Sequence, residues 1–247
     1  NVKILIDPFI SNNPSCSVPV EELNPDIILV THGHADHFGD ALEIANTTHS
    51  PVSAIHEISL FLSKQGINTI GVNIGGSFVF KGIKFTMLDA KHSSDLDIVE
   101  ETVPGGSAAS FLITLEDGTK IFHAGDTGLF GDMKTIIGEI YKPDIVLVPI
   151  GDKFTMGPFE AALATRWFDP KVAIPMHYNT FPPIEQDPSV YSNFVNQLNP
   201  NIDVVILNPG EYFEYEGEKR RIISSIFYFY PNIFFFDDIP HQCHIFQ

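Results

Sequence analysis

The chain is poor in cysteine, tryptophan and positive charge. Its 247 residues include two cysteines, one tryptophan, and 14 lysines and arginines against 31 aspartates and glutamates. Cys16 and Cys243 stand far apart and form no Cys-x-x-Cys pair, which excludes a disulfide framework and a thiolate zinc cluster. The formal net charge of −17 repels phosphate backbones, so general nucleic-acid binding is excluded as well.

Long apolar runs are also missing. No run reaches the roughly 18 apolar residues that a membrane span needs, and no basic segment followed by an apolar stretch opens the chain. We therefore expect no membrane span, and the reducing cytoplasm is the default compartment. Hydrophobic residues make up 44% and charged residues 18% of the chain, which excludes wholesale disorder, collagen-like repeats and a coiled coil.

Short runs rich in valine and isoleucine predict β-strands over 2–6, 27–31, 52–55, 78–80, 83–88, 109–115, 120–124, 145–149, 172–176 and 204–207. Helical spacing predicts helices over 40–47, 57–64, 132–141, 158–167 and 189–198. The pairs Lys81-Gly82 and Asp117-Gly118 separate adjacent strands and predict two antiparallel hairpins. Hairpins followed by alternating strands and helices indicate an α/β fold of two packed sheets with helices outside.

The pattern changes after about Tyr215. Eight of the last 26 residues are aromatic, and they follow a charged stretch over 217–221. We therefore predict a main domain over 1–217 and an aromatic-rich C-terminal tail over 218–247. The tail is an extra packed element, a partner-binding segment or an aggregation-prone appendage. Packing against the domain is favoured because so many apolar side chains are costly to leave in water.

The most informative stretch is 31–37, which reads THGHADH and directly follows a predicted strand. A His-x-His-x-Asp-His match arises by chance on the order of once in a thousand chains of this composition. Alternate residues leaving a strand point the same way, so His32 and His34 can converge on one cation. Asp36 and His37 come on the next turn and are aimed differently, which suits a second cation.

Two cations that share a solvent molecule need about seven protein ligands, and this motif supplies four. His92, Asp126 and His177 each lie at the C-terminal end of a predicted strand, where α/β folds gather functional groups. Taken alone, a histidine such as His92 is more often structural or exposed, and Asp126 in its Gly-Asp-Thr-Gly loop is typical of a turn. Their common position at strand ends favours ligation.

Two further residues have open roles. A ligating imidazole needs an acceptor for its other N–H group, and Asp7 at the end of the first strand is a candidate; a plain turn residue before Pro8 is the equal alternative. His123 lies close to Asp126 in the chain, and it either hydrogen-bonds around the metal site or simply packs.

The order THGHADH, a lone histidine, GDTG and IPMHYNTFP resembles the metallo-β-lactamase superfamily. The resemblance is greatest to its metal-dependent hydrolase branch, similar to YtkL and the UlaG-like lactonases. It runs from about Lys3 to Tyr215 and includes LIDPF, NIGG, HAGDTGLFGDMK and FTMGP. It implies an αββα sandwich of two mixed β-sheets flanked by helices. Family members begin with a further strand pair before the equivalent of Val2, so the resemblance implies that N-terminal strands are missing; the tail has no family counterpart.

The resemblance also implies how the ligands are shared. The first metal takes His32, His34 and His92, the second takes Asp36, His37 and His177, and Asp126 bridges both. Zinc is the favoured metal, although Mn²⁺, Ni²⁺ or Fe²⁺ would fit the same donors.

These ligands imply a hydrolytic mechanism. Two divalent cations roughly 3.5–4 Å apart would bring the pKa of a shared water from 15.7 towards about 7, so that hydroxide can attack a carbonyl or phosphoryl group. Asp126 would bridge the cations, and Asp36 or a metal-bound water could handle the leaving-group proton. We therefore predict a binuclear hydrolase that acts on a small ester, lactone, amide or phosphoester, as a monomer or homo-oligomer.

Two alternatives remain at this point. The resemblance also implies that the same donors could hold a di-iron or mono-iron site in an oxidative enzyme, although no flavin-binding domain is visible in the sequence. The chain could also be a divergent or incomplete copy that binds metal without turnover.

Overall fold

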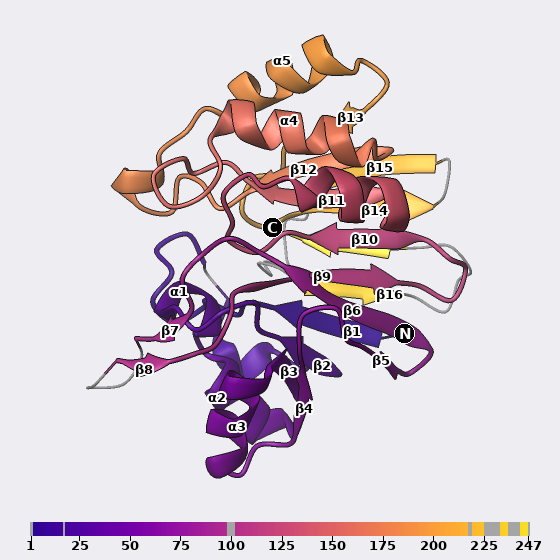
Figure 1. The fold of residues 1–247 in the computed structure, drawn as a ribbon. Coiled ribbons are helices and arrows are strands. Elements are labelled where there is room, and N and C mark those ends of the chain that lie inside the picture. The colour runs from indigo at the N-terminus through magenta and orange to yellow at the C-terminus, as the bar shows by residue number, and fades with distance from the viewer. Residues whose placement is uncertain are drawn as a thin grey trace. The chain divides into compact units, whose positions relative to one another are not determined.

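The computed structural model describes residues 2–16, 18–97, 102–216, 219–224, 233–236 and 243–246. The chain divides into two compact units, each built on its own β-sheet (Figure 1). The first unit consists of Asn1–Asn73, Ser93–Ser107 and Leu207–Gln247, and the second of Ile74–His92 and Ala108–Ile206.

The sheet of the first unit has eight strands in the order β15-β14-β17-β16-β1-β2-β3-β4. Its parallel half consists of β1 (Val2–Ile6), β2 (Ile27–Leu29), β3 (Val52–Ile55) and β4 (Thr69–Val72). The first three are almost continuous apolar runs and are almost wholly buried, as expected for parallel strands covered on both faces. The edge strand β4 was not predicted, because its side chains are half-exposed and show no apolar run.

The other half of this sheet is antiparallel. It consists of β14 (Glu211–Glu216), β15 (Lys219–Ser224), β16 (Ile233–Phe236) and β17 (Cys243–Phe246), and β16 pairs with β1. Three segments of the predicted tail are therefore strands of the sheet, and its remaining residues lie outside the described ones. A domain boundary at residue 217 stays a prediction.

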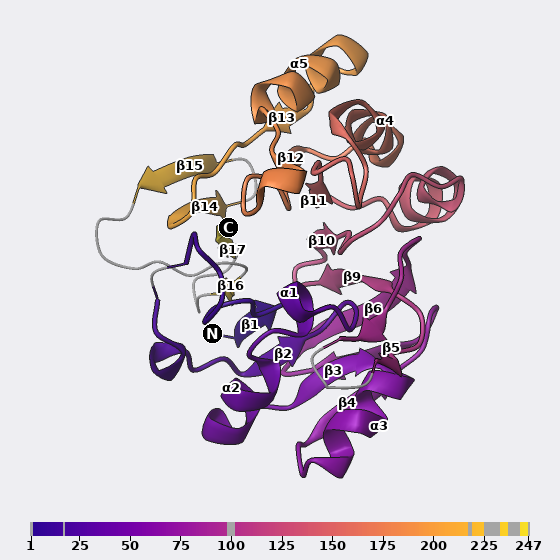
Figure 2. The same ribbon diagram turned by 90° about the vertical axis from the view of Figure 1, so that its left-hand side faces the viewer.

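Short helices and a small ribbon complete the first unit (Figure 2). Its helical segments are η1 (Val20–Glu22), α1 (Ala35–Phe38), α2 (Ala41–Thr48) and α3 (His56–Lys64), and α3 packs against β3 and β4. The predicted helices over 40–47 and 57–64 are thus confirmed. A two-stranded ribbon pairs β7 (Asp95–Leu96) with β8 (Val103–Pro104).

The sheet of the second unit has seven strands in the order β13-β12-β11-β10-β9-β6-β5. The strands are β5 (Ser77–Phe80), β6 (Ile83–Asp89), β9 (Ala109–Thr114), β10 (Lys120–His123), β11 (Ile145–Pro149), β12 (Val172–Met176) and β13 (Asp203–Val204). The first four pair antiparallel, and β10 to β13 pair parallel, so the sheet is mixed.

The antiparallel pairing of both predicted hairpins is confirmed, but a two-residue turn is correct only for the first. Phe80 faces Ile83 across a two-residue turn in which Lys81 and Gly82 have φ angles of 46° and 84°. A left-handed backbone at both positions matches the right-handed twist of the two strands. The second hairpin, between β9 and β10, has a longer loop, since Leu115 N donates to Thr119 O at 2.9 Å.

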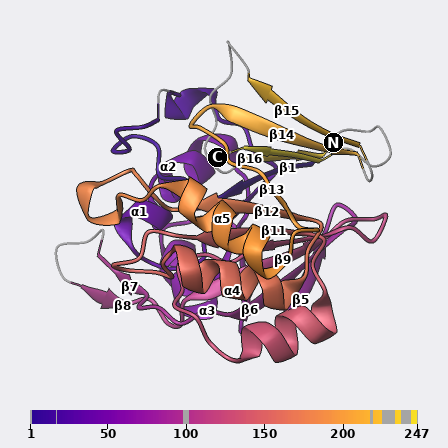
Figure 3. The same cartoon turned by 90° about the horizontal axis from the view of Figure 1, so that it is seen from above.

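Helices cover the sheet of the second unit (Figure 3). They are η2 (Met133–Tyr141), α4 (Pro158–Phe168), η3 (Pro182–Ile184) and α5 (Pro188–Leu198), and α4 packs against η2, α5 and β11. The predicted helix over 132–141 is present as a wide π-helix. A Cβ atom on Gly138 would lie 2.2 Å from Trp167 O, so this glycine lets η2 approach α4 closely. No helix among the described residues is long and apolar enough to cross a membrane.

Candidate metal centre

In the first unit, the THGHADH motif forms the loop from β2 into α1. His32 is fully buried, and Asp36 and His37 lie in α1. The Nε2 atom of His32 lies 3.0 Å from Nδ1 of His34, and the ring centroids of His32 and His37 are 4.1 Å apart. The three imidazoles of the motif are thus gathered in one cluster.

The donor atoms of this cluster form two pairs. His32 and His34 make the first pair through the ring nitrogens just named. The second pair consists of His37 Nε2 and Asp36 Oδ2, which are 3.8 Å apart. Each pair contains the two residues of this motif that were assigned to the same cation. That these residues bind metal stays a prediction.

Gly33 permits the tight turn between His32 and His34. A Cβ atom at this position would lie 2.8 Å from Asp95 O, which is closer than real Cβ atoms come to backbone oxygens. The amide of Gly33 also donates to Ser94 Oγ at 3.3 Å. Only a glycine therefore fits between this loop and the β7 ribbon without displacing one of them.

Asp7 organises the buried side of the cluster. It follows β1 with a left-handed φ of 47°, and its Oδ2 atom accepts a hydrogen bond from His37 Nδ1 at 2.9 Å. Thr31 donates to the same carboxylate twice, from its amide at 2.8 Å and from its hydroxyl at 2.7 Å. Asp7 is thus both a turn residue and the acceptor for an imidazole, which unites the two roles considered from the sequence.

These contacts set the protonation of the rings. A carboxylate only accepts hydrogen bonds, so the proton of His37 lies on Nδ1. Its Nε2 atom is therefore unprotonated, as a metal-binding nitrogen must be. The Thr31 hydroxyl donates a hydrogen bond to Asp7 and can accept one from His32 Nδ1, 3.0 Å away. In that arrangement the Nε2 atom of His32 is the unprotonated nitrogen that can bind a metal. For His34, Ser93 Oγ lies 3.1 Å from Nε2, and Nδ1 points to His32.

In the second unit, the other three predicted ligands follow alternate strands. His92 follows β6, Asp126 follows β10 and His177 follows β12. The Oδ2 atom of Asp126 lies 3.1 Å from His177 Nε2 and 3.7 Å from His92 Nε2. The side chains are only 12%, 4% and 14% exposed for His92, Asp126 and His177, so a carboxylate and two imidazoles meet in a largely buried place.

Backbone geometry fixes the position of His177. Its φ is 55°, a left-handed value that turns the chain sharply after β12. Its carbonyl oxygen would lie 2.6 Å from a Cβ atom on Gly151, in the loop that follows β11. This loop can therefore approach His177 only because residue 151 is a glycine.

His123 supports the loop that carries Asp126. It is 2% exposed, and its Nδ1 atom accepts a hydrogen bond from Gly125 N at 3.2 Å. The ring thus holds the turn into Asp126 from within. This contact favours a supporting role for His123 over simple packing.

The sequence analysis missed two residues that contact predicted ligands, Thr31 and Ser93. Thr31 and Ser93 each adjoin a predicted histidine ligand, and their hydroxyls accept or can accept from ring nitrogens. Their position beside a histidine was the available signal, but serine and threonine beside loop histidines are too common for that signal to be specific.

The donor chemistry fits divalent metal ions. The atoms are imidazole nitrogens and carboxylate oxygens, which suit Zn²⁺, Mn²⁺, Ni²⁺ or Fe²⁺. Asp7, His32 and His37 also bring donor atoms within 4.8 Å of one another. Since the Asp7 oxygens already accept three hydrogen bonds, we regard Asp7 as the acceptor behind the ligands rather than as a ligand.

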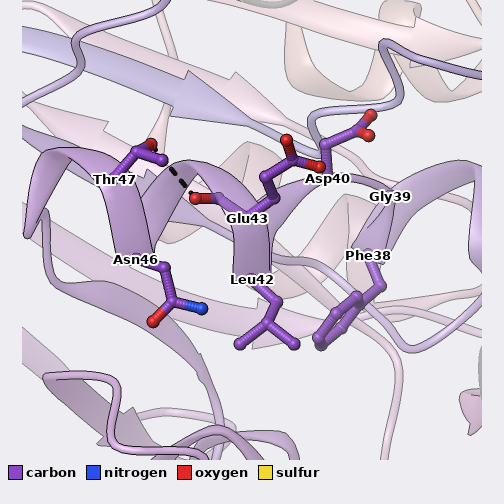
Figure 4. A pocket seen from close by; sticks show the side chains of 7 residues that line it. All are labelled: Phe38, Gly39, Asp40, Leu42, Glu43, Asn46 and Thr47. Atoms are coloured by element: carbon purple, nitrogen blue, oxygen red, sulfur yellow. Dashed lines mark hydrogen bonds between the residues drawn. The ribbon is translucent and has the colours of Figure 1, made fainter. Parts of the chain in front are cut away.

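A separate open pocket lies along α2 in the first unit. It has a volume of about 410 Å³ and is lined by Phe38, Gly39, Asp40, Leu42, Glu43, Asn46 and Thr47 (Figure 4). Its polar groups serve the local structure: Thr47 Oγ1 donates to Glu43 O at 3.1 Å, and Asp40 Oδ2 accepts from the amides of Ile10 and Ser11. The pocket contains none of the seven predicted ligands.

Comparison with known proteins identifies the family. A family model described as a beta-lactamase superfamily domain matches residues 2–178. A UPF0173 metal-dependent hydrolase of Methanobrevibacter smithii is 83% identical over 220 residues, which cover 89% of this chain and 92% of that protein. A UPF0173 metal-dependent hydrolase of Methanosphaera stadtmanae is 56% identical over 214 residues, covering 86% and 92%.

Solved structures agree with this. Igni18, a metallo hydrolase of the archaeon Ignicoccus hospitalis, matches with a TM-score of 0.75 at 39% identity and covers 84% of this chain and 88% of its own. The metallo-β-lactamase fold protein YhfI of Bacillus subtilis matches with a TM-score of 0.60 over 84% of this chain and 96% of its own; at 12% identity it shows the fold alone. The predicted metallo-β-lactamase fold, mixed α/β with sheets flanked by helices, is confirmed. The chain therefore belongs to the β-lactamase superfamily and, within it, to the UPF0173 family of metal-dependent hydrolases.

Proposed function

We propose that the chain is a binuclear hydrolase whose two divalent cations, zinc by preference, are held by seven side chains. His32, His34 and His92 would hold the first cation, Asp36, His37 and His177 the second, and Asp126 both. Membership of the family indicates a metal-dependent hydrolase. The number of cations, their identity and the ligand set are the proposal.

The carboxylate of Asp126 carries this proposal. A bridging carboxylate must lie beside one ligand of each cation. Asp126 Oδ2 lies within hydrogen-bonding or ion-pairing reach of His177, assigned to one cation, and of His92, assigned to the other. A turn aspartate with no functional role has no reason to be 4% exposed between two imidazoles.

The donor pairs of the first unit give independent support. His32 with His34, and Asp36 with His37, each bring two donor atoms together, and a cation with only two protein ligands is incomplete. The second unit offers one further imidazole for each pair and one carboxylate. The two sets of residues complement each other in number and chemistry, and together they make the predicted seven.

Bound cations would supply a water of lowered pKa as nucleophile and would polarise a substrate oxygen at neutral pH. The residues of this chain orient the ligating rings and move the leaving-group proton. Asp7 and Thr31 accept hydrogen bonds from the Nδ1 atoms of His37 and His32, so that the Nε2 atoms of both rings stay unprotonated. Asp36 is about one-third exposed, and its carboxylate could pass a proton to the leaving group.

We propose a small ester, lactone, amide or phosphoester as substrate, handled in the cytoplasm by a monomer or homo-oligomer. Two divalent cations would change the net charge from −17 to about −13 (−17 + 4), which still repels nucleic acid.

The test combines metal analysis with turnover. Elemental analysis of freshly purified protein should give about two metal ions per chain, and the protein should cleave some members of a panel of lactones, thioesters and phosphodiesters. Asp126→Ala should bind fewer ions and lose turnover by at least a hundredfold. Asp144→Asn is the matched control, because this carboxylate accepts from Lys120 N in the same unit without touching a predicted ligand.

Each other result contradicts the proposal in a specific way. One ion per chain would exclude the binuclear site. Equal rates for wild type and Asp126→Ala would favour a metal-binding protein without turnover. A coloured protein with redox-active iron would favour an oxidative enzyme, since d¹⁰ zinc is colourless and redox-silent.

A further inference from the structure

The ligand loops of the second unit are not joined by its sheet. His92, Asp126 and His177 follow β6, β10 and β12, and in the strand order β9 separates the first two and β11 the last two. Neighbouring strands are about 4.8 Å apart, so the Asp126 loop leaves the sheet roughly 10 Å from each of the other two, and the outer two loops leave it roughly 20 Å apart. Other contacts must bring the three side chains together.

Thr127, the residue after Asp126, joins the first two loops. Its Oγ1 atom accepts a hydrogen bond from Lys91 N at 2.9 Å, and Gly128 N donates back to Lys91 O at 3.1 Å. The hydroxyl proton goes to Gly128 O at 2.7 Å. The peptide groups of Lys91, next to His92, are thus held at two points by the loop that carries Asp126.

The backbone of Thr127 is linked to the His177 loop through an intermediate loop. Its carbonyl oxygen accepts from Met156 N at 2.9 Å, in the loop that follows β11. That same loop reaches the end of β12, where Ile150 N donates to Met176 O at 3.0 Å, and Gly151 lies against the carbonyl of His177. Thr127, which is 1% exposed, therefore contacts the His92 loop directly and is linked to the His177 loop through the loop that follows β11.

We propose that Thr127 is a positioning residue that sets the distance of His92 and His177 from Asp126. This inference rests on the proposed metal site, but the contacts that carry it belong to the protein alone. The side chain acts on His92 through Lys91, and the backbone acts on His177 through residues 150–156. Loss of the hydroxyl should therefore release His92 and leave His177 in place.

The variants separate the hydroxyl from the bulk of the side chain. Thr127→Val keeps the shape and removes the acceptor, whereas Thr127→Ser keeps the acceptor and should rescue the wild-type behaviour. Thr165→Val is the matched control: Thr165 is fully buried in the same unit, and its hydroxyl bonds Tyr191 Oη at 2.7 Å, away from the predicted ligands. Thr127→Ala replaces Thr127→Val in the comparison if the valine variant does not fold.

Two measurements read the effect. In metal-free protein, amide hydrogen exchange at Lys91 should become at least tenfold faster in Thr127→Val, while exchange at Met156, which bonds the backbone, stays near wild type. Cobalt titration should show affinity about 10–100-fold weaker, with an altered absorption spectrum, in Thr127→Val but not in Thr127→Ser or Thr165→Val.

The outcomes distinguish this inference from the proposed function. Wild-type exchange at Lys91 in Thr127→Val, or equal exchange changes in Thr127→Val and Thr165→Val, would overturn the role of Thr127. A wild-type protein that binds no cobalt would overturn the proposed metal site, and the exchange measurement would still decide whether Thr127 holds the loops. Failure of Thr127→Ser to restore the spectrum would also contradict the inference.

Discussion

Asp7 and His37 are separated by 30 residues in the chain, and their side chains meet at 2.9 Å between Oδ2 and Nδ1. The parallel pairing of β1 with β2 makes this possible, because it places the end of β1 beside the start of the motif loop. The same carboxylate receives the amide and the hydroxyl of Thr31. One buried acid therefore orients His37 directly and His32 through Thr31.

This relationship predicts the effect of Asp7→Asn. An asparagine has one acceptor oxygen in place of two, so it cannot accept from Thr31 N, Thr31 Oγ1 and His37 Nδ1 together. Zinc affinity, measured by competition with a chelator, should fall about 10–100-fold. Asp40→Asn is the control, since Asp40 accepts two backbone amides in the same unit and none from the motif. Equal losses in both variants would contradict a specific role for Asp7.

Ser93→Ala tests the partner of His34. The hydroxyl 3.1 Å from His34 Nε2 orients a ring that is otherwise only half-buried. Its removal should weaken metal binding about tenfold, less than the loss of Asp7, because one ring is affected in place of two. Calorimetric metal titration checks this. The prediction is wrong if Ser93→Ala matches or exceeds the effect of Asp7→Asn.

Gly33→Ala tests the tight turn inside the motif. The new Cβ atom would meet Asp95 O at 2.8 Å, so the loop or the ribbon must move. We expect a loss of about 1–3 kcal/mol in the free energy of unfolding of the metal-free protein, measured by urea denaturation. Gly131→Ala is the control, because a Cβ atom there meets nothing within 4 Å. A neutral Gly33→Ala would show that the loop adapts.

Tyr191→Phe tests the packing of α5 on α4. Tyr191 is fully buried, and its hydroxyl bonds Thr165 Oγ1 at 2.7 Å. The substitution should cost about 1–2 kcal/mol of stability at pH 8 and leave metal binding unchanged. If this variant lost metal, the Tyr191–Thr165 hydrogen bond could not be independent of the metal site.

The burial of Tyr191 also predicts that the stability of the protein depends on pH. Burial raises the pKa of Tyr191, and the hydrogen bond with Thr165 opposes this only in part. Above about pH 10 the unfolded chain loses the phenolic proton while the folded chain keeps it, so stability falls as pH rises, by up to about 1.4 kcal/mol per pH unit. The stability advantage of wild type over Tyr191→Phe should therefore shrink between pH 9.5 and 11 in urea denaturation. An advantage that grows with pH would contradict this assignment.

Much of the secondary structure could be predicted because its signal is local. The runs over 2–6, 52–55, 145–149 and 172–176 are strands at those bounds, since a continuous apolar run of this length fits a strand buried on both faces. The edge strand β4 was not predicted because it shows no apolar run, and the segments after residue 215 were assigned to a tail because their place in the sheet depends on pairing with β1 and β14.

The candidate site shows the same division. The motif at 31–37 predicts four metal ligands by spacing alone, and strand ends predict the other three. Spacing does not reveal which ring nitrogen is available. That depends on Asp7, 30 residues before His37, and on Ser93, 59 residues after His34.

The amino-acid sequence by itself determined which donor atoms this protein carries, their order along the chain and the strands that they follow. The tertiary structure decided how these strands sort into two sheets, which side chain contacts each imidazole of the 31–37 motif and which loops Thr127 joins. The reason is physical: a residue type and its local periodicity are properties of a short segment. A hydrogen bond between segments dozens of residues apart exists only after strand pairing has brought their ends together.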